Sequence, residues 1–399
     1  MTDLRTISDL DLAGATVLVR ADLNVPLHGG NVTDDFKIEA SLPTISALRS
    51  GGASVVICSH LGRPNGYDPD FSMRPIGARL GELGGFEVVT ASDVAGPDSR
   101  RLVAEAGDRV VVLENTRYES GETSNSPELA ASLSELADVF VLDAFGSAHR
   151  AHASTVGVAG LLPSAVGLLV ADELGAFDRV IDDPARPFVV VLGGAKVSDK
   201  LGVINALLPR VDVMMIGGAM CFTVLAAEGF EIGASLIEEE MLDEVREVLQ
   251  SECGSRISLP VDIVVADSFT SEASHAVHPA DDLPPSGMGL DIGPETAKRF
   301  GAILAGADTI FWNGPMGVSE WEAFAAGTRA IAESVISSSA YSVAGGGDSV
   351  ASLRRMGLKE RVDHMSTGGG AGLELIENGS LVAIEAVRRS GDAKATDRR

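Results

Sequence analysis

The chain has 399 residues, which is enough for two domains of ordinary size, each with its own hydrophobic core. Its 57 acidic and 31 basic residues give a formal net charge of −26, which argues against nucleic acid and anionic membranes as partners. Three widely spaced cysteines form no CxxC pair, and the first residues lack the charged and apolar regions of a secretory signal. We therefore expect a soluble, cytoplasmic protein in which any anionic ligand needs a local basic pocket.

Short runs rich in Val, Ile and Leu recur along the chain and predict β-strands. They lack polar alternation, which favours strands buried on both faces, as in parallel sheets. Segments with helical periodicity lie between them, for example residues 126–138 and 321–339. This alternation predicts an α/β protein built from βαβ units. The predicted strands fall within residues 16–24, 54–60, 109–117, 138–146, 188–196, 213–220, 262–267, 308–315 and 340–348.

Nine strands are too many for one ordinary sheet, so we divide the chain into two Rossmann-like lobes. The predicted lobes are residues 1–166 and 182–379. Residues 167–181 are predicted to form one helix that joins the lobes, and Pro184 and Pro187 follow its end.

Basic and polar side chains follow the predicted strands of the first lobe. In open α/β sheets ligands bind outside the carboxyl ends of the strands, so the turns in SHLGRP, ENTRY and AHRAH are expected to converge on one anion. Taken singly, His149 or His152 is better explained by capping a turn or satisfying a core hydrogen bond, and the anion-binding hypothesis rests on the whole group. The residues concerned are Asp22, Asn24, His60, Arg63, Arg117, His149, Arg150 and His152.

Glycine-rich turns follow the predicted strands of the second lobe. Glycine lets backbone amides approach a phosphate closely, so this lobe is predicted to bind a nucleotide. These turns lie at residues 193–196, 217–220, 313–315, 345–349 and 366–370.

Two lysines in GGAKVSDK stand out because the chain contains only six lysines. The motif fails the GxxxxGK[ST] spacing, but we expect Lys196 and Lys200, four residues apart, to share one face of a helix and bracket a phosphoryl group. The alternative is a solvated helix face.

Asp348 follows three glycines at the start of a predicted helix, where one carboxylate can hold Mg²⁺ that bridges phosphates. Its alternative role is that of a helix N-cap. Glu320 follows another strand, and we expect it to accept a hydrogen bond from a ribose hydroxyl, with a capping or surface role as the alternative.

Over nearly its full length the chain resembles phosphoglycerate kinases. The resemblance rests on VRADLNVP, SHLGRP, DAFGSAHRAHAST, LGGAKVSDK, IGGAM, MGLDIGP, WNGPMGV, AGGGDS and STGGGAGLE, in the family's order. It implies two Rossmann-like lobes with a hinge, with residues 380–399 returning to the first lobe. It also implies reversible, Mg²⁺-dependent transfer of phosphate between ATP and the carboxylate of 3-phosphoglycerate, giving ADP and 1,3-bisphosphoglycerate. A monomer is implied as well.

The resemblance further implies the residues that take part. Phosphoglycerate would be held by Asp22, Asn24, Lys37, His60, Arg63, Arg117 and Arg150. The nucleotide would be held by Gly194, Lys200, Gly217, Gly218, Asn313, Pro315, Glu320, Gly346, Gly347, Asp348 and Ser349, with Asp348 as the ligand of Mg²⁺. The transfer itself would depend on Lys37, Lys196, Lys200, Gly346 and Gly347.

The chain departs from the family pattern mainly on the acceptor side. Lys37 stands where the family has an arginine, and a lysine lacks the planar fork that binds oxygens bidentately. Leu142 stands where the family has an asparagine. Three hypotheses follow: an ordinary phosphoglycerate kinase, a paralogue that phosphorylates a different carboxylic acid, and a non-catalytic sensor of nucleotides or metabolites.

Overall fold

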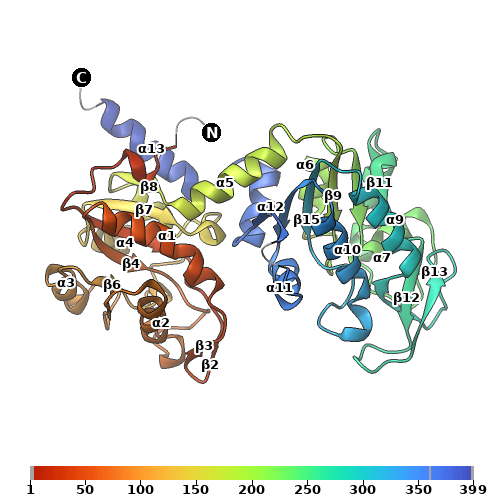
Figure 1. Cartoon of the computed structure of the whole chain (residues 1–399), viewed down its shortest axis with the longest axis horizontal. Coiled ribbons are helices and arrows are strands. Elements are labelled where there is room, and N and C mark those ends of the chain that lie inside the picture. The colour runs from red at the N-terminus through yellow and green to blue at the C-terminus, as the bar shows by residue number, and fades with distance from the viewer. Residues whose placement is uncertain (1–3, 359–360, 397–399) are drawn as a thin grey trace. The chain divides into compact units, whose positions relative to one another are not determined.

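The computed structural model describes residues 4–358 and 361–396. The chain divides into two compact units, which are Met1–Gly175 with Asn378–Arg399, and Ala176–Glu377 (Figure 1). Each unit contains a six-stranded parallel sheet flanked by helices, so the predicted α/β fold with two Rossmann-like lobes is confirmed. None of the helices in the described part of the chain has the length and apolar character that a membrane span requires.

The sheet of the first unit has the order β5-β6-β4-β1-β7-β8, and all neighbouring strands run parallel. Its strands are β1 (Thr16–Ala21), β4 (Ser54–Cys58), β5 (Val88–Thr90), β6 (Val110–Val112), β7 (Val139–Asp143) and β8 (Ser164–Val166). A separate two-stranded ribbon pairs β2 (Leu27–His28) with β3 (Asn31–Val32). The central strands are buried on both faces, which explains their continuous apolar runs.

Several helices of the first unit pack against its sheet. One core cluster joins alternate residues of β1, such as Val17 and Val19, to Ile45 and Leu80 of the first two helices. The last helix packs on β8, and Ala383 at its start donates a backbone hydrogen bond to Ala148 at 3.0 Å. These helices are α1 (Phe36–Ser50), α2 (Arg74–Gly84), α3 (Pro97–Ala104), α4 (Pro127–Ser134) and α13 (Val382–Thr396).

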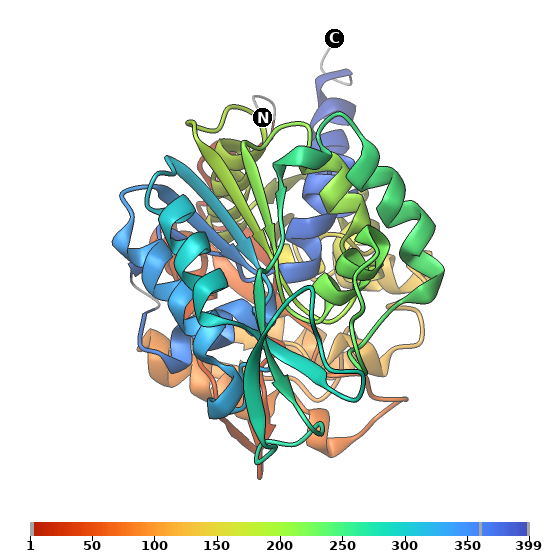
Figure 2. The same cartoon turned by 90° about the vertical axis from the view of Figure 1, so that its right-hand side faces the viewer.

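The main sheet of the second unit has the order β11-β10-β9-β15-β16-β17 and is also parallel (Figure 2). Trp312 is fully buried in its core beside Phe300 and Ile331 of two covering helices. The strands are β9 (Phe188–Leu192), β10 (Val213–Ile216), β11 (Ile257–Ser258), β15 (Thr309–Asn313), β16 (Tyr341–Gly345) and β17 (His364–Met365). The helices are α6 (Leu201–Leu207), α7 (Met220–Glu228), α8 (Leu242–Gln250), α9 (Pro294–Leu304), α10 (Ala326–Ser337), α11 (Gly347–Arg355) and α12 (Gly369–Asn378).

A second, antiparallel sheet in this unit corrects one sequence-based expectation. The run within residues 262–267 forms β12 (Asp262–Ala266), but β12 pairs antiparallel with β13 (His275–Pro279) and β14 (Met288–Ile292). All five residues of β12 are buried, so its composition matches that of a parallel strand. Burial, and not strand direction, sets the apolar pattern that we used for prediction.

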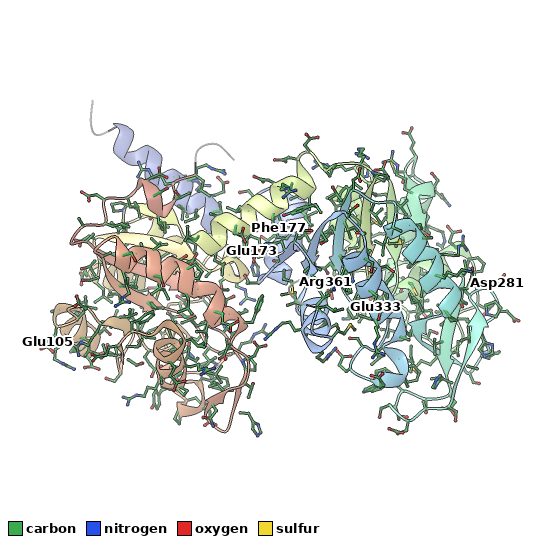
Figure 3. All side chains as sticks on the ribbon, in the orientation of Figure 1. Glu105, Glu173, Phe177, Asp281, Glu333 and Arg361 are labelled. Atoms are coloured by element: carbon green, nitrogen blue, oxygen red, sulfur yellow. The ribbon has the colours of Figure 1, made fainter. Side chains whose placement is uncertain are left out.

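Helix α5 (Leu168–Ile181) contributes residues to both units. At its start, the buried carboxylate of Asp143 accepts a hydrogen bond from the backbone of Leu169 at 3.1 Å, and the hydroxyl of Thr44 accepts one from Leu168 at 2.9 Å. Burial raises the pKa of Asp143 to about 6. Further along, Phe177 contacts Phe311 of β15 edge-on, with ring centroids 6.1 Å apart (Figure 3).

Gly167 joins β8 to α5 at a position with no space for a side chain. A Cβ there would lie 2.1 Å from the carboxylate oxygen of Asp143 that holds Leu169. We predict that Gly167→Ala lowers the free energy of unfolding by about 1–3 kcal/mol, measured by chemical denaturation. The control is Gly175→Ala in the same helix, where a Cβ meets nothing within 4 Å and should raise stability by up to about 1 kcal/mol. Equal effects of the two substitutions would contradict this prediction.

Candidate functional site

The predicted anion-binding residues of the first unit lie at one edge of its sheet. Strands β6, β4, β1 and β7 are consecutive neighbours in the sheet, and their carboxyl ends share this edge because the strands are parallel. Arg117 follows β6, His60 and Arg63 follow β4, and Asp22 and Asn24 follow β1. His149, Arg150 and His152 follow β7.

Lys37 lies on α1 and contacts this edge through Asp22. Its Nζ donates to Oδ2 of Asp22 at 2.8 Å, and the Asp22 side chain is only 4% exposed. Burial opposes ionisation of Asp22, but the charge and the hydrogen bond of Lys37 prevail and hold its pKa below the usual range. The lysine that replaces the family arginine is thus the charge partner of a buried carboxylate.

Asn115 fixes two of these loops to each other, and sequence reasoning did not single it out. Its Oδ1 accepts hydrogen bonds from the backbone of Leu61 and Arg117, and its Nδ2 donates to the carbonyls of Leu61 and Phe71. The side chain is fully buried and its hydrogen-bonding capacity is used. Asn115 is the asparagine of the ENTRY motif, so the sequence could have pointed to it, but its hydrogen-bond partners are visible only in the tertiary structure.

Arg117 and His149 present buried donors to this edge. Nε of Arg117 and Nδ1 of His149 are buried and have no hydrogen-bond partner among the residues that the structure describes. Burial and the neighbouring Arg150 lower the pKa of Arg117. Buried donors without partners are costly, so these two groups fit a site that receives acceptor oxygens.

His152 follows the same strand but belongs to the core. Its side chain is 10% exposed, and its Nδ1 lies 3.7 Å from Oε1 of the fully buried Glu122. Burial lowers the pKa of His152 to about 4. The core interpretation of this histidine, which the sequence left open, is therefore correct.

In the second unit, the glycine turns after β9, β10 and β15 are hydrogen-bonded to one another. Gly194 donates to the carbonyl of Pro315 at 3.0 Å, and Gly218 donates to that of Met316 at 3.0 Å. Gly218 has a φ of +64°, and a Cβ there would lie 2.4 Å from the nitrogen of Gly194. Glycine is thus required by both the backbone conformation and the close approach of the turns.

Lys196 and Lys200 do not share a helix face, which corrects our expectation. Residues 193–200 form a loop, and α6 begins at Leu201 with Lys200 as its N-cap. Lys196 is exposed, whereas Lys200 is buried. The chain between the two lysines is not helical, so their spacing of four residues does not place them on one helix face.

Lys200 is held in a cage of oxygen atoms. Its Nζ donates to the carbonyl of Gly193 at 2.6 Å, to Oδ1 of Asn313 at 2.7 Å and to the carbonyl of Asn313 at 3.2 Å. Burial lowers its pKa to about 8, partly offset by the charges of Asp348 and Asp199. The Nδ2 of Asn313 is buried without a hydrogen-bond partner, and it lies close to the turn at Gly345.

Asp348 lies in the first turn of α11, and Gly346 is the N-cap of that helix. The N-cap alternative for Asp348 is therefore wrong. Its neighbour Ser349 is fully buried and accepts a hydrogen bond from the backbone of Gly314 at 2.6 Å. This bond ties the start of α11 to the turn after β15.

A cavity of about 440 Å³ opens beside these turns. Its volume suits a nucleotide-sized ligand. Five residues predicted from sequence to bind nucleotide line it, namely Gly194, Gly218, Pro315, Glu320 and Asp348. The predicted residues Lys196, Lys200, Gly217, Asn313, Gly346, Gly347 and Ser349 are not among its lining residues.

The apolar part of this lining was not predicted residue by residue. It includes Phe222, Leu290 and Met316, which offer flat and flexible apolar surface. Asp291 also lines the cavity, and burial raises its pKa to about 7. The MGLDIGP motif contains Leu290 and Asp291, but an apolar lining looks like ordinary core in a sequence.

Glu238 is a further residue that sequence reasoning missed. Its Oε2 accepts hydrogen bonds from the backbone of Val197 and Ser198, and its Oε1 accepts one from the Ser198 hydroxyl at 2.5 Å. These bonds and the charge of Lys196 keep the pKa of Glu238 below its usual range. Glu238 thus fixes the loop that carries both lysines.

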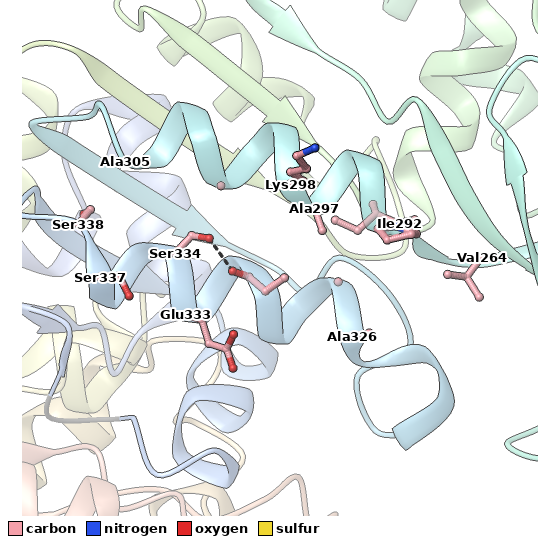
Figure 4. A pocket seen from close by; sticks show the side chains of 15 residues that line it. Val264, Ile292, Ala297, Lys298, Ala305, Ala326, Glu333, Ser334, Ser337 and Ser338 are labelled. Atoms are coloured by element: carbon pink, nitrogen blue, oxygen red, sulfur yellow. Dashed lines mark hydrogen bonds between the residues drawn. The ribbon is translucent and has the colours of Figure 1, made fainter.

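A second cavity of about 640 Å³ lies along α9 and α10 (Figure 4). Small residues of the two helices dominate its lining, and Lys298 and Glu333 are its charged residues. The hydroxyl of Ser334 is occupied by a hydrogen bond to the carbonyl of Ala330 at 2.7 Å. None of the residues predicted from sequence to bind a ligand lines this cavity.

The protein consists of two units, each built on a parallel sheet. One unit has buried cations, and the other has glycine turns beside a nucleotide-sized cavity. These features are those of an α/β protein of the small-molecule kinase class. The sequence model of the family "Phosphoglycerate kinase" matches residues 7–379. The phosphoglycerate kinase of Frankia casuarinae is 52% identical over 399 residues, covering 96% of this chain and 100% of the relative. That of Thermus thermophilus is 51% identical over 387 residues, covering 96% and 99%.

Solved structures agree with these relatives. Phosphoglycerate kinase from Coxiella burnetii has a TM-score of 0.85 and 38% identity, covering 97% of this chain and 99% of that structure. The enzyme from Pyrococcus horikoshii has a TM-score of 0.85 and 32% identity, covering 98% and 100%. The chain belongs to the phosphoglycerate kinase family, and its activity is that of a kinase that transfers phosphate to a carboxyl group. Among our three hypotheses, the comparisons favour the ordinary phosphoglycerate kinase.

Proposed function

We propose that the first unit binds 3-phosphoglycerate or 1,3-bisphosphoglycerate and that the second unit binds ATP or ADP with Mg²⁺. The observation that carries this division is the buried, unpartnered Nε of Arg117 at the cation-rich sheet edge. The chain has a net charge of −26, so a cluster of partly buried cations is unusual in it and is explained by binding of an anion. The glycine turns of the second unit offer backbone amides and a cavity instead.

In the first unit, Arg63, Arg117 and Arg150 would supply charge to the phosphate and carboxylate of the acid. Asp22 and Asn24 would orient its hydroxyl group, because both follow β1 at the same edge. His60 would donate a hydrogen bond. These roles agree with the lowered pKa of Arg117, which reflects its burial and its neighbouring cations.

In the second unit, the nucleotide would lie in the cavity lined by Gly194, Gly218 and Pro315, with Glu320 toward its ribose. Its phosphates would approach Lys200 and the amides at the start of α11. Among the residues that the structure describes, no group of three acidic, histidine or cysteine side chains could hold a metal ion. This fits Mg²⁺, which binds one or two carboxylates and completes its shell with phosphates and water. Asp348 would be that carboxylate.

The reaction needs little from the protein beyond alignment and charge. The carboxylate of the substrate attacks the phosphorus of the terminal phosphate in line, so no side-chain nucleophile is required. Lys37, Lys196 and Lys200, with the amides at Gly346 and Gly347, would stabilise the charge on the transferring group. Because one chain supplies both sets of residues, we propose a monomer, and its free cysteines suit the cytoplasm.

The role of Lys37 is tested by steady-state transfer from MgATP to 3-phosphoglycerate, with the acyl phosphate consumed by a coupled reduction. We predict that Lys37→Met lowers kcat by about 10²–10³, the usual cost of one lost transition-state contact. Lys37→Arg should remain within about tenfold of wild type, because the charge is kept. The control is Lys298→Met, whose lysine side chain is 80% exposed. A Lys37→Met enzyme as active as this control would contradict the assignment, and a wild type without transfer would contradict the function.

The role of Lys200 predicts a pH dependence. Its pKa of about 8 means that its charge is present below pH 8 and lost above it. We predict that kcat/KM for MgATP falls as the pH rises through about 8, because this ratio reports groups of the free enzyme. In Lys200→Arg the fall should move to higher pH, because arginine keeps its charge. The same profile for both enzymes would show that another group is responsible.

A further inference from the structure

Arg20 is a fully buried arginine in the middle of the first unit's sheet. It lies on β1, and its neighbours Val19 and Ala21 point to the opposite face of the sheet, into the core formed with α1 and α2. A buried guanidinium is costly unless every donor finds an acceptor. Its Nη1 donates to the carbonyl of Ala21, and its Nε donates to the hydroxyl of Ser154 at 2.8 Å.

The charge of Arg20 is balanced through Ser154. The Ser154 hydroxyl donates in turn to Oε1 of Glu122 at 2.6 Å, and the backbone of Ser154 donates to Oε2 at 3.0 Å. Glu122 is fully buried, like Arg20. The hydroxyl therefore stands between a buried cation and a buried anion, and its single proton must point toward Glu122. This chain of bonds fixes the guanidinium in place.

The remaining contact of Arg20 is with His60. Its Nη2 lies 3.0 Å from Nδ1 of His60, whose side chain is also buried. A guanidinium has donors only, so the hydrogen bond requires an unprotonated Nδ1 that accepts. A neutral imidazole carries one proton, which then resides on Nε2. A second proton on Nδ1 would face the N–H of a buried cation.

The other charges around His60 act in the same direction, with one exception. Arg117, in the turn after β6, and Lys37, on α1, oppose protonation of the imidazole, whereas Asp22, after β1, favours it. Burial and the charge of Arg20 lead these causes, and together they lower the pKa of His60 well below its ordinary value. The electrostatics and the hydrogen-bond geometry thus both require a neutral imidazole at His60.

We propose that Arg20 is a positioning residue that fixes His60 as the neutral, Nε2-protonated tautomer, through the chain Glu122–Ser154–Arg20–His60. His60 then offers the sheet edge a directed N–H donor in place of a positive charge. It cannot serve as a base through Nδ1, because that lone pair is occupied. The use of this donor to bind an oxygen of 3-phosphoglycerate rests on the proposed function, whereas the tautomer is a property of the free protein.

The tautomer is measured directly by NMR of the full chain labelled with ¹⁵N-histidine. Long-range proton–nitrogen correlation distinguishes a protonated ring nitrogen from an accepting one, and His60→Gln identifies the signal among the seven histidines. We expect an accepting Nδ1 and a protonated Nε2, unchanged from pH 5 to pH 9. A protonated Nδ1 in wild type, or an imidazolium within this range, would overturn the proposal whether or not any variant folds.

Two substitutions test whether Arg20 is the cause. Arg20→Met removes the guanidinium that donates to Nδ1 of His60. We then expect the ¹⁵N chemical shifts of both His60 ring nitrogens to move toward the average of the two neutral tautomers. Arg20→Lys keeps a cation with donors only and should restore the wild-type pattern. The control is Arg101→Met on the surface of α3, where the arginine side chain is 54% exposed. A wild-type pattern in Arg20→Met would overturn the causal role of Arg20.

Addition of 3-phosphoglycerate separates this proposal from the proposed function. A shift of the Nε2 proton of His60, with Nδ1 still accepting, supports both. If the tautomer is as proposed but saturating 3-phosphoglycerate leaves His60 unmoved, the binding role of His60 fails and the positioning role of Arg20 stands.

Discussion

Parallel β-strands deliver the residues that follow them to one edge of the sheet, and both candidate sites depend on this constraint. In the first unit the edge receives arginines and histidines from three strands, and Asp22 and Asn24 from a fourth, β1. In the second unit the corresponding edge receives glycine turns, which pack so closely that Gly193 and Gly218 leave no room for a Cβ. Similar architectures thus produce a pocket rich in side-chain charge in one unit and a pocket rich in backbone amides in the other.

The cations of the first unit are held by buried polar side chains. Asn115 ties the loop of Arg117 to that after β4, and Glu122 anchors Arg20 through Ser154. Asp22 pairs with Lys37. In each case a positively charged side chain lies near other positive charges. The hydrogen bonds around these side chains are nearly complete, and they offset the repulsion between the charges. The unpartnered donors of Arg117 and His149 are the groups that we propose bind an anion.

The sequence allowed the strands, and the polar residues that follow them, to be predicted, because both have local signals. All nine apolar runs contain a strand of the structure. Strands of two or three residues, such as β11 and β17, carry too little pattern to be recognised, and the exposed β13 lacks an apolar run. The antiparallel pairing of β12 was missed because burial alone shaped its composition.

Prediction failed where a residue acts through tertiary contacts. The spacing of Lys196 and Lys200 suggested a helix face, but the loop between them is fixed by Glu238, about forty residues away in the sequence. Asn115 and Glu122 look like ordinary polar residues until their burial is known. His152 looked like a ligand because it lies near His149, yet the chain turns it toward Glu122.

The most direct test of this account is a crystal structure of the protein with bound 3-phosphoglycerate. We predict that oxygens of the bound acid lie within hydrogen-bonding distance of Nε of Arg117 at the edge formed by β6, β4, β1 and β7. Binding of the acid to the glycine turns of the second unit, or crystals that show no bound acid at saturating concentration, would contradict the account.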